Sequence, residues 1–380
     1  MQPTFSQLDM QTRIKRDSAL MKADALIDWE TLRPLLTGLY KREKSQAGGQ
    51  EPIDALLMFK ATLLGQWHSL SDPKLEEALH LRIDFMQFCG LNLTDAVPDE
   101  TTLCRFRNRL IKANKLAPLL AAVNAQLQGH GLMVKHARGA VIDATLVTSA
   151  ARPKREVTIE EQAFDDTPKA SAADAAAPPA NANANTSTAT HSDTQASAHY
   201  EVETKFSVDP DATWLKKGSK LTFGYRTYMA TDNGDGYVRG VHTAPANESE
   251  FNHFAPALAA TDFKPARVYS DKGFASRANR IHLHSQQIKS AIMHRAAKNK
   301  PLTVRQKNAN KRISKTRYIV EQSFGTLKRL FKMGRASYMG TVKVNGQMLI
   351  KAMCMNLLKA ANKICLHPIQ AGKLPPLLVA

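Results

Sequence analysis

The chain has 380 residues, enough for two or three domains, and 43% hydrophobic with 23% charged residues is a globular composition. A collagen-like, wholly disordered or disulfide-stapled protein is therefore excluded. The charge is the most informative global number, because 52 Lys and Arg against 34 Asp and Glu give a formal net charge of +18. So many positive side chains repel one another unless a polyanion binds, so nucleic acid is the first candidate partner.

The cysteines and the apolar runs indicate the cellular compartment in which the protein is expected. The four cysteines (Cys89, Cys104, Cys354 and Cys365) lie far apart with no C-x-x-C pair, which favours a reducing compartment over a disulfide framework or a structural zinc site. The longest uncharged stretch, 116–134, is interrupted by proline and amide side chains. We therefore expect an unsecreted, cytoplasmic protein with no membrane partner.

Residues 20–115 have the pattern of a helical region. An apolar run predicts a helix at 55–64. A second helix is expected to start at 71–73, where Ser-Asp-Pro is followed by two glutamates near the positive end of the helix dipole. A third helix is expected at 101–112, after the turn 97–100.

One face of the third helix is basic. Arg105, Arg109 and Lys112 recur at i, i+4 and i+7, apart from an apolar stripe on the same helix. Such a face fits a helix-turn-helix-like element that rests on DNA phosphates. It fits an ordinary solvated helix face equally well.

From residue 139 the pattern changes to strands. We predict them at 140–147, 221–229, 237–243, 267–271 and 290–293. Helices are predicted at 275–286, 318–331 and 342–364. A further helix start is expected at Asn247, whose spacing to Glu250 resembles a capping box. This order predicts an α/β (α+β) fold with a mixed β-sheet flanked by helices.

An insertion separates the first two predicted strands. Residues 170–198 contain twelve alanines and no Leu, Ile, Val, Met or Phe, so they cannot bury enough apolar surface to offset the entropy of ordering. We expect a disordered insertion over about 151–200, at the end of a hairpin.

Two aspartates and one glutamate stand out. Asp143 lies inside an apolar strand, where a carboxylate needs a cation beside it. Asp271 ends another strand, although an Asp there is more often a turn former. Glu321 is the single acid among thirteen Lys and Arg in residues 295–335, and it shares a helix face with Arg317 and Lys328. A simple Arg317–Glu321 helix pair explains part of this spacing equally well.

Three carboxylates in a basic protein suit a hard divalent cation. Mg²⁺ and Mn²⁺ prefer oxygen ligands and accept phosphates as co-ligands. Two such ions about 3.5–4 Å apart serve an in-line displacement at phosphorus.

Several motifs together resemble a known family. They are Val-Ile-Asp143-Ala-Thr, Tyr-Ser-Asp271-Lys-Gly-Phe and Arg317-x3-Glu321-x6-Lys328, with the helical segments 70–79 and 98–107 and the strand motif 223–226. In this order they resemble bacterial insertion-sequence DDE transposases of the insertion sequence family five group. The resemblance covers roughly residues 20–365, the insertion excepted.

The resemblance implies an RNase H-like catalytic domain that cleaves element ends and transfers strands into target DNA. It implies Mg²⁺, with Mn²⁺ as a substitute and two ions expected, held by Asp143, Asp271 and Glu321. It also implies that Arg317 and Lys328 contact phosphates, and that the protein acts as a homo-oligomer on DNA in the nucleoid. The expected domains are 1–135 (all-helical, DNA-binding) and 136–366 (catalytic), with a tail at 367–380.

One position departs from the family signature. The signature has Tyr three residues before the arginine, and this chain has Ser314 there. Two alternatives to a transposase stay open, and Ser314 together with the insertion favours the first of them. One is a DNA-binding regulator of the element without catalysis, and the other is a metal-dependent nuclease without strand transfer.

Overall fold

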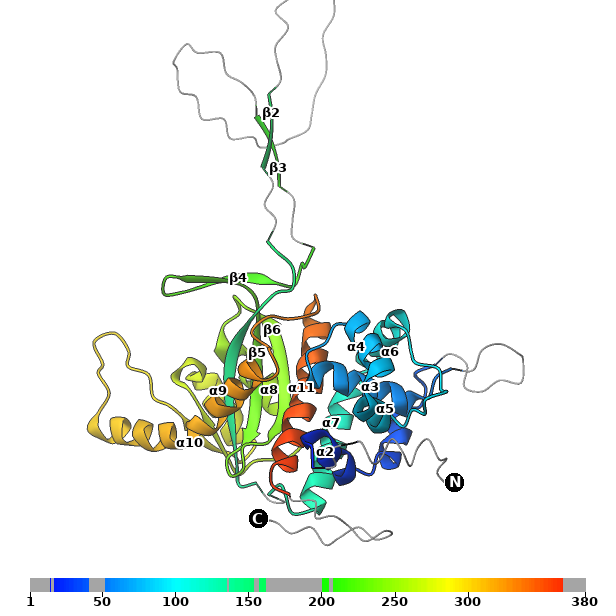
Figure 1. The fold of residues 1–380 in the computed structure, drawn as a ribbon. Coiled ribbons are helices and arrows are strands. Elements are labelled where there is room, and N and C mark those ends of the chain that lie inside the picture. The colour runs from blue at the N-terminus through cyan, green and yellow to red at the C-terminus, as the bar shows by residue number, and fades with distance from the viewer. Residues whose placement is uncertain are drawn as a thin grey trace, which may run out of the picture. The chain divides into compact units, whose positions relative to one another are not determined.

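The structure is a computed structural model, and it describes residue 14 and residues 17–40, 52–134, 137–153, 157–161, 200–204 and 208–364. The chain divides into two compact units, one made of 1–151 with 209–380 and the other of 152–208 (Figure 1). None of the helices in the described part is long and apolar enough to cross a membrane.

In the smaller unit the described backbone forms one antiparallel strand pair. Its strands are β2 (Val157–Glu161) and β3 (Tyr200–Thr204). β2 lies inside the segment 151–200 for which disorder was expected, and its sequence Val-Thr-Ile has the β-branched residues that favour strands. The alanine-rich stretch 170–198 lies outside the described residues.

The N-terminal part of the larger unit is helical, as predicted. Its elements are α2 (Ala19–Leu26), the 3-10 helix η1 (Glu30–Leu36), α3 (Ala55–Trp67), α4 (Asp72–Leu81), α5 (Ile83–Cys89), α6 (Glu100–Lys112) and α7 (Leu116–Gly129). Proline lies in the first turn of α4, and Asp99 caps α6 by accepting a hydrogen bond from the backbone N–H of Thr102 at 2.6 Å. The predicted starts of these two helices are thereby confirmed.

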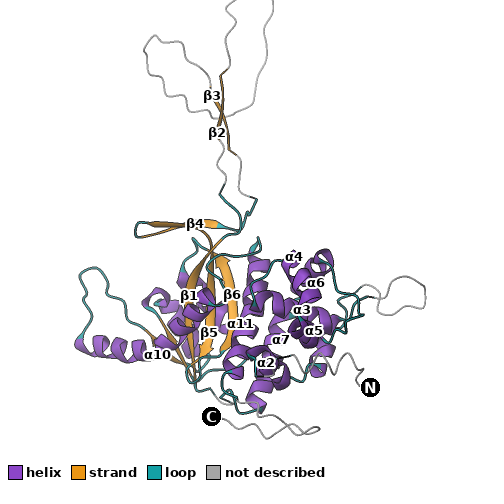
Figure 2. Cartoon of the chain, viewed as in Figure 1, coloured by secondary structure: helices purple, strands orange, loops and turns teal. Residues whose placement is uncertain are grey.

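The rest of the larger unit holds a mixed sheet flanked by helices, as expected (Figure 2). Its strands are β1 (Gly139–Thr148), β4 (Thr213–Lys217), β5 (Lys220–Asp232), β6 (Val238–Pro245), β7 (Arg267–Ser270) and β8 (Lys289–Ile292). β5 pairs antiparallel with β1, β4 and β6, whereas β7 pairs parallel with β1 and β8. The remaining elements are η2 (Glu250–His253), α8 (Phe254–Ala259), η3 (Lys272–Phe274), α9 (Arg277–Ser285), α10 (Val304–Arg329) and α11 (Thr341–Ala361).

The two faces of the sheet have different covers. Residues alternate along a strand, so Val141 packs into one core with Val320 of α10, while Ile142 packs into another with Phe254 of α8 and Leu283 of α9. α11 lies against β6 and also contacts α2, α3 and α7, so one helix serves both the sheet and the N-terminal helices. A side chain at position 143 therefore points toward α10.

Strand β4 was not predicted, and its place explains the insertion. Thr148 at the end of β1 and Thr213 at the start of β4 both lie opposite Gly224 of β5, so the chain leaves the sheet and returns at the same point. A Cβ at Gly224 would collide with the backbone of Val147. Buried Asp209 accepts a hydrogen bond from the Tyr225 hydroxyl at 2.5 Å, which fixes the returning chain to β5.

Two predicted helix starts are wrong. The segment after Asn247 is a 3-10 turn that starts after Ser249 and has no side-chain cap, so the capping-box spacing is incidental. α10 begins at Val304 rather than 318, with a capping box between Thr303 and Gln306. Its first three turns are mostly exposed and carry no apolar stripe, which is why periodicity did not detect them.

Candidate active site

Asp143 lies in the middle of β1, on the face that α10 covers. Its Oδ2 accepts a hydrogen bond from Nη2 of Arg317 at 2.6 Å, and its Oδ1 accepts one from the backbone N–H of Ala144 at 2.8 Å. Only 15% of its side chain is exposed. The expected cation beside this mid-strand acid is therefore confirmed, and it is Arg317.

Asp271 directly follows β7, the parallel neighbour of β1. The register pairs Ile142 with Ser270, so Asp271 at the carboxyl end of β7 lies beside Asp143 in the middle of β1. Its Oδ1 accepts a hydrogen bond from the backbone N–H of Lys272 at 2.6 Å and lies 3.6 Å from Nη1 of Arg317. Because β1 and β7 run parallel, two acids far apart in sequence come together.

Glu321 reaches the same place from α10. Its Oε1 lies 3.7 Å from Nη2 of Arg317, one turn earlier on the helix, and its side chain is 61% exposed. The expected helix pair between these two residues therefore exists. It is one part of a larger arrangement, since a single guanidinium lies within ion-pair distance of all three acids, which come from a strand, a strand end and a helix.

The electrostatics of Arg317 reflect this arrangement. Burial by itself lowers the pKa of the guanidinium, but the charge of Asp143, the hydrogen bond to it and the charges of Asp271 and Glu321 outweigh burial and raise the pKa. The side chain is 11% exposed and is the cation that balances the acids. Arg317 thus lies among the three acids, and the phosphate contact expected of it stays a prediction.

The three acids offer an all-oxygen donor set. Within the described ranges no three His, Cys, Asp or Glu side chains are grouped as a metal site, and these acids face the guanidinium instead. The donor chemistry nevertheless fits a hard divalent cation, because the acids already gather around one positive charge and Glu321 is open to solvent. A metal ion would replace Arg317 as the charge that holds them together.

Lys328 lies two turns beyond Glu321 on α10 and lines a cavity of about 380 Å³. Thr145 of β1 and Lys216 and Lys217 of β4 line the same cavity. Burial and the charges of Lys220 and Lys217 lower the pKa of Lys328. Sequence reasoning missed the lysines of the β4–β5 hairpin, although Lys-Lys-Gly-Ser-Lys at 216–220 was the signal that could have found them.

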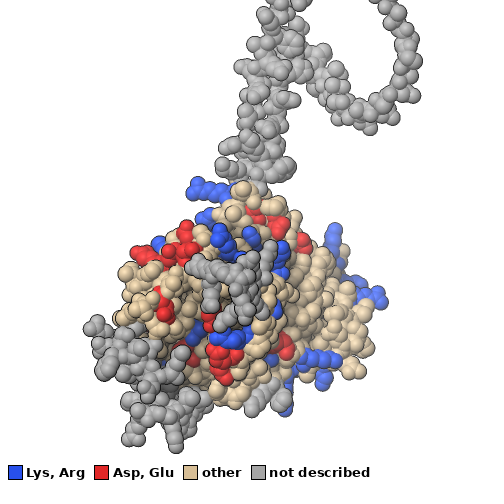
Figure 3. Space-filling model, turned by 90° about the vertical axis from the view of Figure 1, so that its right-hand side faces the viewer, with Lys and Arg blue, Asp and Glu red and all other residues tan. Residues whose placement is uncertain are grey.

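The basic residues predicted on α6 are exposed. Arg105, Arg109 and Lys112 all lie on the outer side of the helix, while Arg107 between them is buried and pairs with Asp72. In the view of the molecule that has the helical region in front, Lys and Arg occur in separate groups among Asp and Glu (Figure 3). The structure does not bring these three residues to the acids.

Comparisons with known proteins agree with this geometry. Residues 8–109 match the family model described as "Transposase domain (DUF772)", and residues 135–357 match "Transposase DDE domain". The chain belongs to the DDE transposase family, so it is a DNA transposase, an enzyme that cleaves and joins DNA. It is 38% identical over 261 residues, 68% of this chain and 78% of the relative, to "Transposase for insertion sequence element IS1106" from Neisseria meningitidis serogroup B. No solved structure matches the chain.

These matches establish a bacterial insertion-sequence transposase that acts on DNA and belongs to a family that uses divalent metal ions. They are compatible with the insertion sequence family five group.

Proposed function

We propose that Asp143, Asp271 and Glu321 are the metal ligands of an RNase H-like catalytic domain. The observation that carries this proposal is the convergence of the three acids on one guanidinium. Two Mg²⁺ ions, or Mn²⁺ as a substitute, would polarise the scissile phosphate and activate the attacking oxygen. The proposed domains are 1–135 for DNA binding and 136–366 for catalysis, with a tail at 367–380.

The side chains around the acids have separate tasks. Asp143 and Asp271 are fixed by backbone N–H groups, so one oxygen of each is held in place before any ligand binds. Glu321 is the most exposed of the three and completes the set from the helix. Arg317 holds the acids together until a divalent cation enters, and the phosphate contact expected of it requires its guanidinium to leave them.

Lys328 is proposed to position the DNA backbone beside the acids. It shares its cavity with Thr145, two residues from Asp143, and the charges of Lys217 and Lys220 act on its ammonium; the one acid among the described residues that line the cavity, Glu250, pairs with Arg226. A phosphate would relieve the repulsion among these lysines.

The DNA partners follow from the same proposal. Arg105, Arg109 and Lys112 on α6 are proposed to contact phosphates at the inverted-repeat ends of the element. An insertion sequence has two ends, so we propose a homo-oligomer that holds both, acting in the cytoplasm on nucleoid DNA.

A labelled duplex carrying an element end tests the proposal. The wild-type chain should nick the end and join it to target DNA with Mg²⁺ or Mn²⁺. Glu321→Gln keeps the size of the side chain but deletes its charge, so it should bind the end at least as well and show no cleavage or joining. Lys328→Ala should lower turnover through poorer phosphate positioning and keep some Mn²⁺ activity. Glu77→Gln, an exposed acid on α4, is the matched control and should behave as wild type.

Three outcomes would change the conclusion. Robust cleavage by Glu321→Gln would remove Glu321 from the site. A wild-type chain that binds the ends specifically but never cleaves would indicate the regulator, a reading that Ser314 in place of the family tyrosine would then explain. Cleavage without joined products would indicate the nuclease.

A further inference from the structure

A long stretch of the catalytic region contains no acid at all. Residues 272–320, between Asp271 and Glu321, include no Asp or Glu and thirteen Lys and Arg. We name residues 272–320 the acid-free segment; it comprises η3, α9, β8 and α10 as far as residue 320. Arg317 is its one cation that makes an ion pair with an acid in the described part of the chain, and the other twelve make none. A solvated surface would normally mix both signs of charge.

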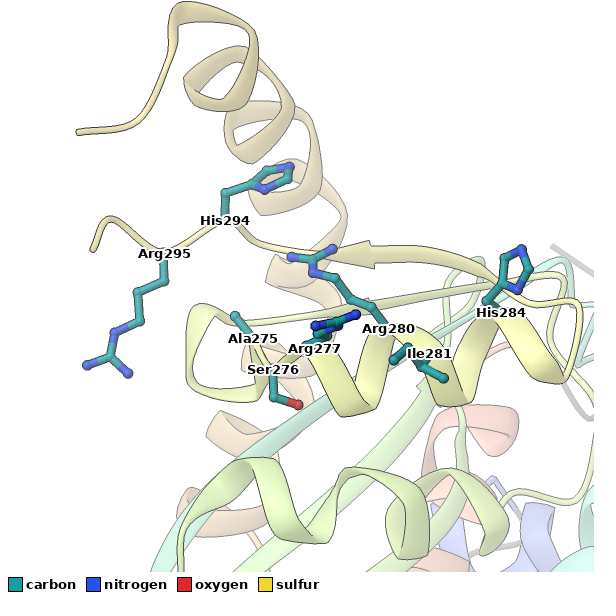
Figure 4. Close-up of a pocket in the computed structure, with 8 residues that line it drawn as sticks. All are labelled: Ala275, Ser276, Arg277, Arg280, Ile281, His284, His294 and Arg295. Atoms are coloured by element: carbon teal, nitrogen blue, oxygen red, sulfur yellow. The ribbon is translucent and has the colours of Figure 1, made fainter. Parts of the chain in front are cut away.

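A cavity in this segment concentrates the charge. Arg277 and Arg280 project from α9 and Arg295 from the chain after β8, and with His284 and His294 they line a cavity of about 550 Å³ (Figure 4). No Asp or Glu is among the described residues that line it. Three guanidinium groups that share one cavity without an acid repel one another, so an anion is the ligand that the cavity fits.

The positive charge of Arg280 is held by contacts to neutral groups and not, within the described part of the chain, by an acid. It is half-buried, and burial lowers the pKa of its guanidinium. Its Nη2 donates to the carbonyl oxygen of Ile292 at 3.1 Å, and its Nη1 lies 3.4 Å from the Ser290 hydroxyl. Both contacts are to neutral groups, so they orient the side chain without balancing its charge. A phosphate in the cavity would supply the missing negative charge.

The acid-free segment and α6 lie at opposite ends of the unit. β8 is the edge strand of the sheet farthest from β6, and β6 is the strand against which α7 and α11 pack. α9 and the first part of α10, which cover opposite faces of the sheet, lie to the left in Figure 1, and α6 with the other N-terminal helices lies to the right. Asp271 and Glu321 bound the segment in sequence, so a polyanion bound there reaches the three acids from the side away from α6.

We propose that the acid-free segment binds the target DNA duplex through its phosphates, while α6 binds the element end. This inference rests on the proposed function, because strand transfer must bring two DNA molecules to one catalytic site. Lys and Arg contacts to phosphates position a duplex without reading its sequence, which is what a target-binding surface needs. The position of the segment on the far side of the acids lets both duplexes reach them together.

The experiment compares two double variants of the full-length chain. Arg277→Ala with Arg295→Ala removes two exposed cations of the cavity and leaves Arg280, with its backbone contact, in place. Lys264→Ala with Lys343→Ala is the control, since it removes two exposed cations outside the segment. Circular dichroism and thermal melting establish that all proteins are equally folded.

Two measurements follow. The first is binding to a duplex of unrelated sequence across a salt series. The cavity variant should lower the slope of log affinity against log salt by about two units, and the control should leave it unchanged. The second is the ratio of joined to cleaved product with a labelled element end and a plasmid target. This ratio should fall roughly tenfold in the cavity variant, which corresponds to a loss of about 1.4 kcal/mol in target binding.

The outcomes separate this inference from the proposed function. A wild-type chain that never cleaves element ends refutes the proposed function. If all proteins cleave, and the cavity variant keeps the joined-to-cleaved ratio and the salt slope of wild type, then the target-binding inference is refuted and the proposed function is not. An equal loss of cleavage and joining would also overturn it, since the segment would then hold the element end.

Discussion

Replacing Arg317 by methionine should destabilise the metal-free protein, because it leaves three carboxylates without their shared cation. Arg317 and Asp143 are 11% and 15% exposed, and breaking a buried pair by removing one partner costs about 3–5 kcal/mol. The contact with Glu321 adds at most ~1 kcal/mol, since that side chain is 61% exposed. Because Asp271 is one-third exposed and Asp143 can gain water after the change, we expect a loss near the lower limit, about 3 kcal/mol.

The assay is equilibrium unfolding in urea with EDTA, followed by circular dichroism, for wild type, Arg317→Met and Arg312→Met. Arg312 is exposed on the same helix and makes no ion pair with a described residue, so its change should cost less than about 0.5 kcal/mol. Arg317→Lys keeps a positive charge and should fall between wild type and Arg317→Met.

Divalent metal gives the second half of this test. Adding Mn²⁺ should raise the melting temperature of Arg317→Met more than that of wild type, because the ion supplies the charge that the variant lacks, whereas in wild type it must first displace the guanidinium. An Arg317→Met protein as stable as wild type, or an equal Mn²⁺ effect on both, would refute the reasoning that one guanidinium holds the three acids.

Three further predictions concern other parts of the larger unit. Burial lowers the pKa of Lys351 to about 8, so between that pH and its ordinary pKa the unfolded chain holds a proton that the folded chain has lost, and the stability of the fold rises with pH. From pH 7.5 to pH 9.5 the free energy of unfolding of wild type should therefore rise by roughly 2 kcal/mol relative to that of Lys351→Met. An equal difference between the two proteins at both pH values would contradict this. Changing Arg105, Arg109 and Lys112 together to alanine should lower the salt slope of DNA binding by about three units, whereas an unchanged slope would make α6 an ordinary solvated helix. Trp214 is 51% exposed on the lysine-bearing β4–β5 hairpin, so DNA should quench its fluorescence, and Trp214→Phe should abolish that change while leaving the signal of the other tryptophans.

The sequence was sufficient for features that depend on neighbouring residues. An apolar run located α3, proline in the first turn located α4, and a turn followed by an apolar stripe located α6, because a helix buries one face and its ends have local sequence signals. A carboxylate inside an apolar strand marked Asp143 as a residue that required a cation. The motif order also sufficed for the family, which the matches at 8–109 and 135–357 establish.

Features that depend on long-range pairing required the tertiary structure. No local pattern shows that Thr148 and Thr213 meet at one residue of β5, because strand register is a relation between distant segments. The exposed first half of α10 has no periodicity to read, yet the packing of its second half on β1 brings Arg317 to Asp143. Coulomb interactions depend on distance in space. Only the packing of the strands against α10 decided that Arg317 pairs with all three acids and not with Glu321 alone.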